Sequence, residues 1–213
     1  DELLAEIKAL SPDTLVHSVY CDFSKQDSIK KCADEINDLC GEIDVRYNTK
    51  RQLVLCHDRE KRNLENELLE DLLKHDKPMN LMIDIKAFGI ESAIQLGKDV
   101  VQMILKYPNH TYELCSFNEY CVLEMIRIRE QSELFIFHVG VISSGVSIGM
   151  FNDLSIDFVS FNYDIIHEEI LNRLKTQNIK VYAWVCNDEM VKKDMEYKYM
   201  IDGIIYDYDS GSC

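Results

Sequence analysis

Residues 40–59 read CGEIDVRYNTKRQLVLCHDR and join two apolar runs through a short polar segment. Glu42 and Asp44 stand two positions apart in the first run, so in a β-strand both side chains point to the same face. Ile43 and Val45 then point to the opposite face. Two acidic side chains on one face of a strand are costly unless a cation or hydrogen bonds compensate them. The pattern therefore favours a metal site on this strand.

The second half of the same segment adds a candidate base. A polar turn at residues 48–51 is followed by the apolar run 53–56, which ends at His57 and Asp58. Histidine is the side chain that most readily exchanges protons near neutral pH. The segment thus predicts a metal ion and a proton-transferring histidine close together.

The composition of the chain narrows the possible partners. Its 213 residues carry a formal net charge of −15, which argues against nucleic acid or an anionic membrane as a partner. No run of about eighteen apolar residues occurs, so no transmembrane segment is expected. The eight cysteines lack zinc-ligand spacing, which favours buried thiols in a reducing compartment and a cytoplasmic location. The first residue is Asp1 rather than methionine, as expected where a leader has been removed or lies outside the given sequence.

Predicted strands and helices alternate along the whole chain. The principal strands begin near residues 15, 41, 81, 112, 134, 156, 179 and 202. The predicted helices are 1–10, 27–39, 64–74, 91–106, 119–130, 144–152, 164–176 and 188–198. Eight β/α alternations with short connections predict an α/β fold, a closed parallel (β/α)₈ TIM barrel. No linker interrupts it, so residues 1–213 are expected to form a single domain. An open doubly wound sheet is the alternative, but the chain has no glycine-rich phosphate loop.

In such a barrel the chemistry lies at the carboxyl ends of the strands. The polar residues expected there are His17, Glu42, Asp44, His57, Asp84, Lys86, Ser116, Asn118, Glu119, His138, Asn162, Trp184, Asn187 and Asp207. Their concentration at one end of the barrel exceeds what stability alone requires.

The order of these residues resembles a known enzyme family. His17 is followed by E-I-D at 42–44, V-L-C-H-D at 54–58, I-D-I-K at 83–86, S-F-N at 116–118, A-W-V-C-N at 183–187 and D-G-I-I-Y-D-Y at 202–208. The chain is similar over nearly its whole length to glycerophosphodiester phosphodiesterases. No single motif is decisive, whereas their order and spacing together are fairly specific.

The resemblance implies an activity and a set of roles. Glu42, Asp44 and Asp84 would ligate a divalent cation, Mg²⁺ or Ca²⁺, which oxygen-only ligands suit. His17 and His57 would be the general acid/base pair, and Lys86 would contact the phosphate. The expected reaction is hydrolysis of a small glycerophosphodiester, or of a lysophospholipid, to glycerol phosphate and an alcohol. In the family's chemistry the substrate's own glycerol hydroxyl attacks phosphorus, and water then opens the cyclic phosphate.

Two departures from the family pattern keep alternatives open. His17-Ser18-Val19 replaces H-R-G, and Gln26-Asp27-Ser28 stands where E-N-[TS] is usual. The lost arginine is expected to help hold phosphate. A histidine without that arginine also resembles sphingomyelinase D-like phospholipases, although the closing W-x-x-N and D-G-I motifs favour the glycerophosphodiester enzymes. A catalytically impaired relative that binds a phosphate ligand or a protein partner is the third possibility.

Each candidate residue also has a purely structural interpretation. Asp84 could form an ion pair with Lys86 instead of binding a metal. Trp184, the only tryptophan, could wall the pocket or fill the core. Ser116 and Asn118 are expected to form a turn, and His138 is expected to be a structural histidine. His110 is expected to be solvated.

Overall fold

The computed structural model describes residues 40–59, 61, 65–132, 136–145 and 154–207, together with the strand at 16–20 without its side chains. The predicted helices 1–10 and 27–39, and most of the one at 144–152, lie outside the described residues. The side chain of His17 lies outside them as well.

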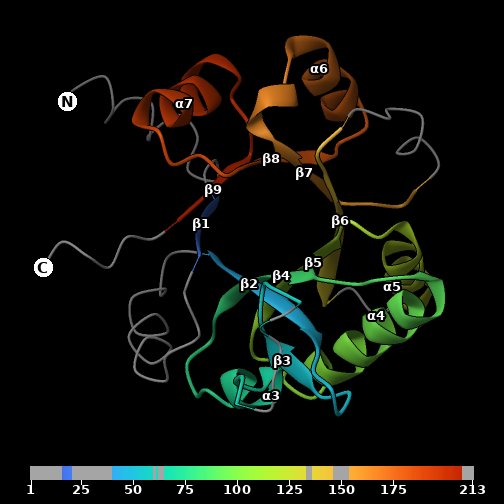
Figure 1. The fold of residues 1–213 in the computed structure, drawn as a ribbon. Helices are drawn as coiled ribbons and strands as arrows, with labels where there is room; N and C mark the ends of the chain where they lie inside the picture. The colour runs from blue at the N-terminus through green and yellow to red at the C-terminus, as the bar shows by residue number, and fades with distance from the viewer. Residues whose placement is uncertain are drawn as a thin grey trace, which may run out of the picture.

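Eight parallel strands follow one another around a curled sheet (Figure 1). They are β1 (Val16–Tyr20), β2 (Cys40–Tyr47), β4 (Asn80–Ile85), β5 (Thr111–Ser116), β6 (Phe137–Ser143), β7 (Phe158–Asn162), β8 (Lys180–Trp184) and β9 (Gly203–Asp207). Each pairs in parallel with the next in this series, and β1 also pairs in parallel with β9. A ninth strand, β3 (Leu53–Leu55), runs antiparallel to β2 outside this series. The described sheet is therefore that of an α/β, TIM-barrel-like fold.

The helices lie on the outer side of the curled sheet (Figure 1). They are α3 (Leu69–Leu73), α4 (Ile90–Ile104), α5 (Glu119–Ser132), the short 3₁₀ turn η3 (Tyr163–Ile165), α6 (Glu168–Thr176), α7 (Glu189–Lys193) and the π-helical turn η4 (Asp194–Lys198). Three of the predicted helices, at 91–106, 119–130 and 164–176, are confirmed with shifted ends. The helix predicted at 188–198 divides into α7 and η4, and the one predicted at 64–74 shortens to α3.

Alternation along β2 explains how its two faces differ. Ile43 and Val45 are 1% and 0% exposed and belong to the apolar layer between sheet and helices. The alternate residues Cys40, Glu42 and Asp44 face the other way, as the period of two requires. Cys40 joins a separate inner cluster that fills the space enclosed by the strands. This cluster also contains Met82, Cys115, Ile142, Phe158, Tyr182 and Ile205.

Gly140 on β6 makes room for that inner cluster. A Cβ atom at this position would lie 2.3 Å from the ring of Phe158 on the neighbouring strand, far inside van der Waals contact. Phe158 is fully buried and packs on Tyr182, with ring centroids 5.1 Å apart. The inner cluster therefore fills the interior of the curled sheet. The carboxylates remain accessible from the carboxyl ends of the strands. No helix within the described residues is long and apolar enough to cross a membrane.

Candidate active site

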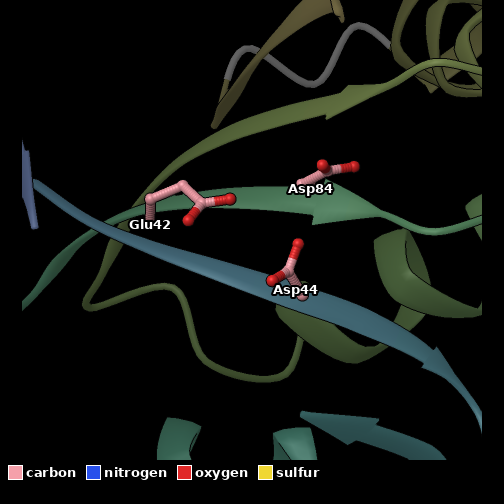
Figure 2. A group of neighbouring side chains, drawn as sticks. All are labelled: Glu42, Asp44 and Asp84. Atoms are coloured by element: carbon pink, nitrogen blue, oxygen red, sulfur yellow. The ribbon is translucent and has the colours of Figure 1, made fainter. Parts of the chain in front are cut away.

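Three carboxylates from two neighbouring strands meet at the carboxyl end of the sheet. Asp44 on β2 is the direct register partner of Asp84 on β4, and Glu42 precedes Asp44 by two positions on the same face. One carboxylate oxygen from each of the three residues lies within 4.8 Å of the others. Figure 2 shows the three carboxylates turned toward a common space between β2 and β4. The parallel register thus assembles the predicted acidic triad.

Several carboxylate oxygens of this triad are buried and accept no hydrogen bond within the described part of the chain. Asp44 and Asp84 are 5% and 4% exposed, and Asp44 Oδ2 and Asp84 Oδ1 are buried without a hydrogen-bond partner among the described residues. Burial, then the neighbouring charges of Asp44 and Asp84, raises the pKa of Glu42 well above its usual range. Burial also raises the pKa of Asp84 to about 6, against the opposing effect of Lys86. Buried oxygen-only donors that lack partners fit a hard divalent cation such as Mg²⁺ or Ca²⁺, so this acidic cluster could hold one.

Lys86 follows β4 directly and places its ammonium between the two aspartates. Its Nζ lies 2.9 Å from Asp44 Oδ1 and also forms an ion pair with Asp84 Oδ2. Burial alone would lower the pKa of Lys86, but the carboxylates of Asp84 and Asp44 outweigh this and raise it. The same ammonium lies 5.7 Å from the centroid of the Phe117 ring. The ion pair between Asp84 and Lys86, the structural alternative drawn from the sequence, is therefore present in this structure.

His57 lies just beyond β3, and its position is fixed from two sides. Arg46 on β2 donates hydrogen bonds to the backbone carbonyl oxygens of Cys56 (2.8 Å) and His57. The Nδ1 atom of His57 lies 2.8 Å from Asp58 Oδ1. The hydrogen bond with Lys61 and, to a smaller extent, the one with His57 lower the pKa of the Asp58 carboxyl to about 2. Asp58 is therefore ionised at neutral pH. An ionised acceptor at Nδ1 favours the tautomer in which Nε2 is the free basic atom.

These groups line one cavity of about 360 Å³. Its polar lining comprises Glu42, Asp44, His57, Asp84, Lys86, Ser160 and Asp207, and its apolar lining comprises Met82, Cys115, Phe117, Ile142, Trp184, Val185 and Ile205. Trp184 donates a hydrogen bond from Nε1 to the Ser160 carbonyl (3.1 Å), and its ring meets that of Phe117 edge to face at 5.7 Å between centroids. All predicted site residues whose side chains are described thus share this cavity. The side chain of His17 is not described, so its role stays a prediction.

Other histidines and turn residues take structural positions. Asn118 accepts from the backbone N–H of Tyr120 at the start of α5, as expected of a turn residue. Ser116 donates to the Ile85 carbonyl at 2.6 Å. His138 is the second residue of β6, at its amino end, with Nδ1 3.7 Å from Asp157 Oδ1. The prediction for His110 was wrong, because this residue is only 5% exposed.

Three residues of the site were not assigned a role from the sequence. Phe117 lies in the quoted S-F-N motif, between the two turn residues and directly after β5. An aromatic residue at the carboxyl end of a strand was the sequence signal that could have identified it. Asp207 is hydrogen-bonded to the side chain of Asn187 at 2.7 Å, and both lie in the quoted closing motifs. Arg46 continues the alternation of Glu42 and Asp44. Nothing in the sequence around Arg46 indicates that it contacts the backbone of Cys56 and His57.

Comparison with solved structures gives matches at low sequence identity. A phosphodiesterase from Oleispira antarctica, solved with the product sn-glycerol-3-phosphate, has a TM-score of 0.75 and 15% identity, covering 91% of this chain and 93% of that one. A glycerophosphodiester phosphodiesterase from Parabacteroides distasonis has a TM-score of 0.71 and 19% identity with the same coverage. One from Agrobacterium tumefaciens has a TM-score of 0.56 and 11% identity, covering 90% and 96%.

No protein-family model and no curated protein sequence matches the chain. The structural likeness therefore concerns the arrangement of the backbone, over more than nine-tenths of each chain compared for the first two structures. The fold of this protein is that of the glycerophosphodiester phosphodiesterases, as the sequence motifs predicted.

Proposed function

We propose that this protein is a metal-dependent phosphodiesterase that hydrolyses glycerophosphodiesters to glycerol phosphate and an alcohol. The observation that carries the proposal is one cavity that combines three buried carboxylates, the ammonium of Lys86 and the imidazole of His57. The likeness in fold to a phosphodiesterase solved with sn-glycerol-3-phosphate supports the choice of substrate.

We also infer that residues 1–213 form a single domain with a closed (β/α)₈ barrel. The parallel pairing of β1 with both β2 and β9 supports closure, because it links the first and last strands of the series. A closed barrel presents its active-site groups at the carboxyl ends of the strands, which is where the cavity lies.

Glu42, Asp44 and Asp84 are the residues that would hold the divalent cation. When bound there, the cation would stabilise the negative charge that builds up on the phosphoryl oxygens. Asp44 and Asp84 contribute adjacent ligands because the β2–β4 register places them side by side. Glu42, two positions before Asp44 on the same face of β2, would complete the set.

His57 would transfer the protons of the reaction. With Nδ1 held by ionised Asp58, its Nε2 atom can accept the proton of the attacking glycerol hydroxyl. The backbone contacts of Arg46 to Cys56 and His57 keep this imidazole at the edge of the cavity. His17, which begins the motif series on β1, is the proposed partner that protonates the leaving oxygen.

Lys86 and Trp184 would bind and orient the substrate. The ammonium of Lys86 reaches the same cavity and can donate to a non-bridging phosphate oxygen. Trp184 and Phe117 present an aromatic wall next to this charge, against which the carbon skeleton of the substrate would pack.

The test is hydrolysis of glycerophosphocholine and glycerophosphoethanolamine in Mg²⁺, Ca²⁺ or EDTA. Turnover that requires a cation and falls at least 100-fold in His57→Ala is expected, since general acid–base catalysis contributes about 10²–10⁴-fold. His138→Ala is the matched control. The side chains of His57 and His138 are 59% and 57% exposed, but His57 lines the cavity whereas His138 lies at the amino end of β6. A folded protein that binds cation yet cleaves neither diester would contradict the proposal and favour a binding role.

A further inference from the structure

The ammonium of Lys86 lies between two of the proposed cation ligands. Its Nζ is 2.9 Å from Asp44 Oδ1 and forms an ion pair with Asp84 Oδ2. Asp44 and Asp84 also belong, with Glu42, to the three residues whose carboxylate oxygens lie within 4.8 Å of one another. The lysine therefore neutralises the same carboxylates that a divalent cation would bind.

A divalent cation at these carboxylates would remove the attraction that holds the ammonium there. The ammonium is attracted by the negative charges of Asp44 and Asp84, and the two positive charges of a cation would cancel these and repel it. The aspartate side chains are 4% and 6% exposed, so water and salt screen this repulsion little. Ammonium and divalent cation are therefore alternative partners of the two aspartates.

The side chain of Lys86 can leave the aspartates while its backbone stays in place. Its backbone N–H donates to the Val45 carbonyl oxygen at 2.9 Å, which ties the main chain to β2. Its ammonium is carried on a flexible four-carbon stem. Lys86 and Phe117 both line the cavity, and Nζ lies 5.7 Å from the centroid of the Phe117 ring. An ammonium released from the aspartates thus remains in the cavity, beside an aromatic ring that attracts cations.

Within the described lining of the cavity, Lys86 is the only lysine or arginine that could hold a phosphate. Four carboxyl groups line the same space, those of Glu42, Asp44, Asp84 and Asp207. Moving the ammonium to an anion while no other cation is present would leave two buried aspartates uncompensated, which is strongly unfavourable. A phosphate therefore gains this partner only when a divalent cation has taken over the aspartates.

We infer that Lys86 binds the aspartates and the phosphate in turn. Without a divalent cation its ammonium neutralises Asp44 and Asp84, and binding of the cation displaces it to a phosphate oxygen of the substrate. This inference rests on the proposed function and adds an order of binding, cation before phosphate. Because linked binding free energies are reciprocal, each ligand strengthens the binding of the other through Lys86.

Calorimetric titration of Mg²⁺ or Ca²⁺ into cation-free protein, with and without sn-glycerol-3-phosphate, tests this order. In wild type we expect the phosphate probe to lower the Kd for the cation. In Lys86→Met the cation alone should bind about tenfold more tightly than in wild type or better, because no ammonium has to be displaced. The factor by which the probe lowers the Kd should be smaller in Lys86→Met by about tenfold, because only the direct attraction between cation and phosphate remains.

Lys192→Met is the matched control for these titrations. Lys192 is 21% exposed, against 16% for Lys86, and lies 2.8 Å from Glu189 in an ion pair away from the cavity lining. This control should match wild type in both titrations. Lys86→Gln, whose amide can still donate to one aspartate, gives the same two comparisons if Lys86→Met does not fold. Cation binding no tighter than in wild type, or an equal effect of the probe in wild type and variant, would overturn the inference.

Neither titration requires turnover, so this inference and the proposed function can fail separately. If both differences are found but no diester is cleaved, the role of Lys86 stands and the proposed hydrolysis fails. If diesters are cleaved with a cation present but the differences are absent, hydrolysis stands and this role of Lys86 fails. A folded protein that binds neither Mg²⁺ nor Ca²⁺ contradicts both.

Discussion

Replacing Lys86 with methionine removes one charge from the active site while keeping an unbranched side chain of similar length. The ammonium of Lys86 lies 2.9 Å from Asp44 and also contacts Asp84, and the three side chains are 16%, 4% and 6% exposed. Lys86→Met therefore leaves two buried carboxylates without their shared cation. We expect the variant to be strongly destabilised in EDTA and to recover stability when a divalent cation is added.

The expected loss of unfolding free energy can be worked out from the distance between Lys86 and Asp44 and from the burial of both side chains. At 2.9 Å the attraction between unit charges is about 6 kcal/mol for an effective dielectric constant of about 20. Part of it is offset in the wild type by the desolvation of the same groups. Removing one partner of a buried ion pair leaves the other uncompensated and costs about 3–5 kcal/mol. The expected decrease in unfolding free energy lies in this range.

Urea unfolding of wild type and variant in EDTA measures the loss, and calorimetric titration with Mg²⁺ or Ca²⁺ measures cation affinity. The matched control is Lys74→Met, because Lys74 lies 3.0 Å from Asp71 in a pair whose members are 55% and 51% exposed. That control is expected to leave stability unchanged. The variant should also bind the cation more tightly, since no ammonium competes for the aspartate oxygens. If Lys86→Met is as stable as Lys74→Met in EDTA, the argument from buried charge is refuted.

Three further predictions concern parts of the molecule away from the cation. His110→Ala should lower unfolding free energy by about 3 kcal/mol in urea titrations, because it deletes a buried ring that bonds the Leu73 carbonyl and the Met79 amide; a loss below 1 kcal/mol would contradict this. Gly140→Ala should cost about 1–3 kcal/mol in the same assay, and Phe158→Leu in the same chain should recover part of it by relieving the 2.3 Å clash; no recovery would exclude the clash as the cause. Burial and, to a smaller extent, the negative charge of Asp71 raise the pKa of the Glu67 carboxyl to about 7. The native state therefore keeps a proton that the unfolded state releases above about pH 4, and wild-type stability falls as pH rises from there to about 7. Glu67→Gln should consequently be more stable than wild type by about 1 kcal/mol at pH 8, allowing for partial exposure, and equal to it at pH 4; a constant difference would argue against this titration.

Much of the fold could be predicted because strand and helix patterns here are local. Alternation in residues 42–45 and 81–85 gave two strands with acids on one face, and the structure brings Asp44 beside Asp84 through the β2–β4 register. The helices α4 and α6 also lie close to where their periodicity placed them. The ends of the elements were less accurate: β6 begins at Phe137 instead of residue 134, which moves His138 to the amino end of its strand.

What could not be predicted depends on contacts between distant segments. His110 is buried because it bonds backbone groups of residues 73 and 79, more than thirty positions earlier, and nothing in its own neighbourhood indicates this. The sequence left open whether Lys86 binds phosphate or pairs with Asp84. In this structure the ammonium of Lys86 pairs with both Asp44 and Asp84, and the pairing of β2 with β4 is what brings Asp44 within its reach. Phe117 was missed for the same reason, since its contacts with Lys86 and Trp184 exist only in the folded chain.

The attachment of β3 has a consequence for how activity is lost under mild stress. The carboxylates are carried by β2 and β4, each hydrogen-bonded to strands on both sides. Among the described residues, β3 pairs along its length with β2 alone and is otherwise joined only to the segment before α3, through the Val54–Leu68 bridge and the hydrogen bond from the Leu55 N–H to the Glu67 carbonyl. Fewer register pairs therefore have to separate to open the segment that carries His57 than to part β2 from β4, and partial openings of this kind occur at free energies well below that of global unfolding. Amide hydrogens of residues 53–57 should exchange faster than those of β4. In low denaturant, the proposed hydrolysis should therefore be lost before the proposed binding of a divalent cation to the acidic triad.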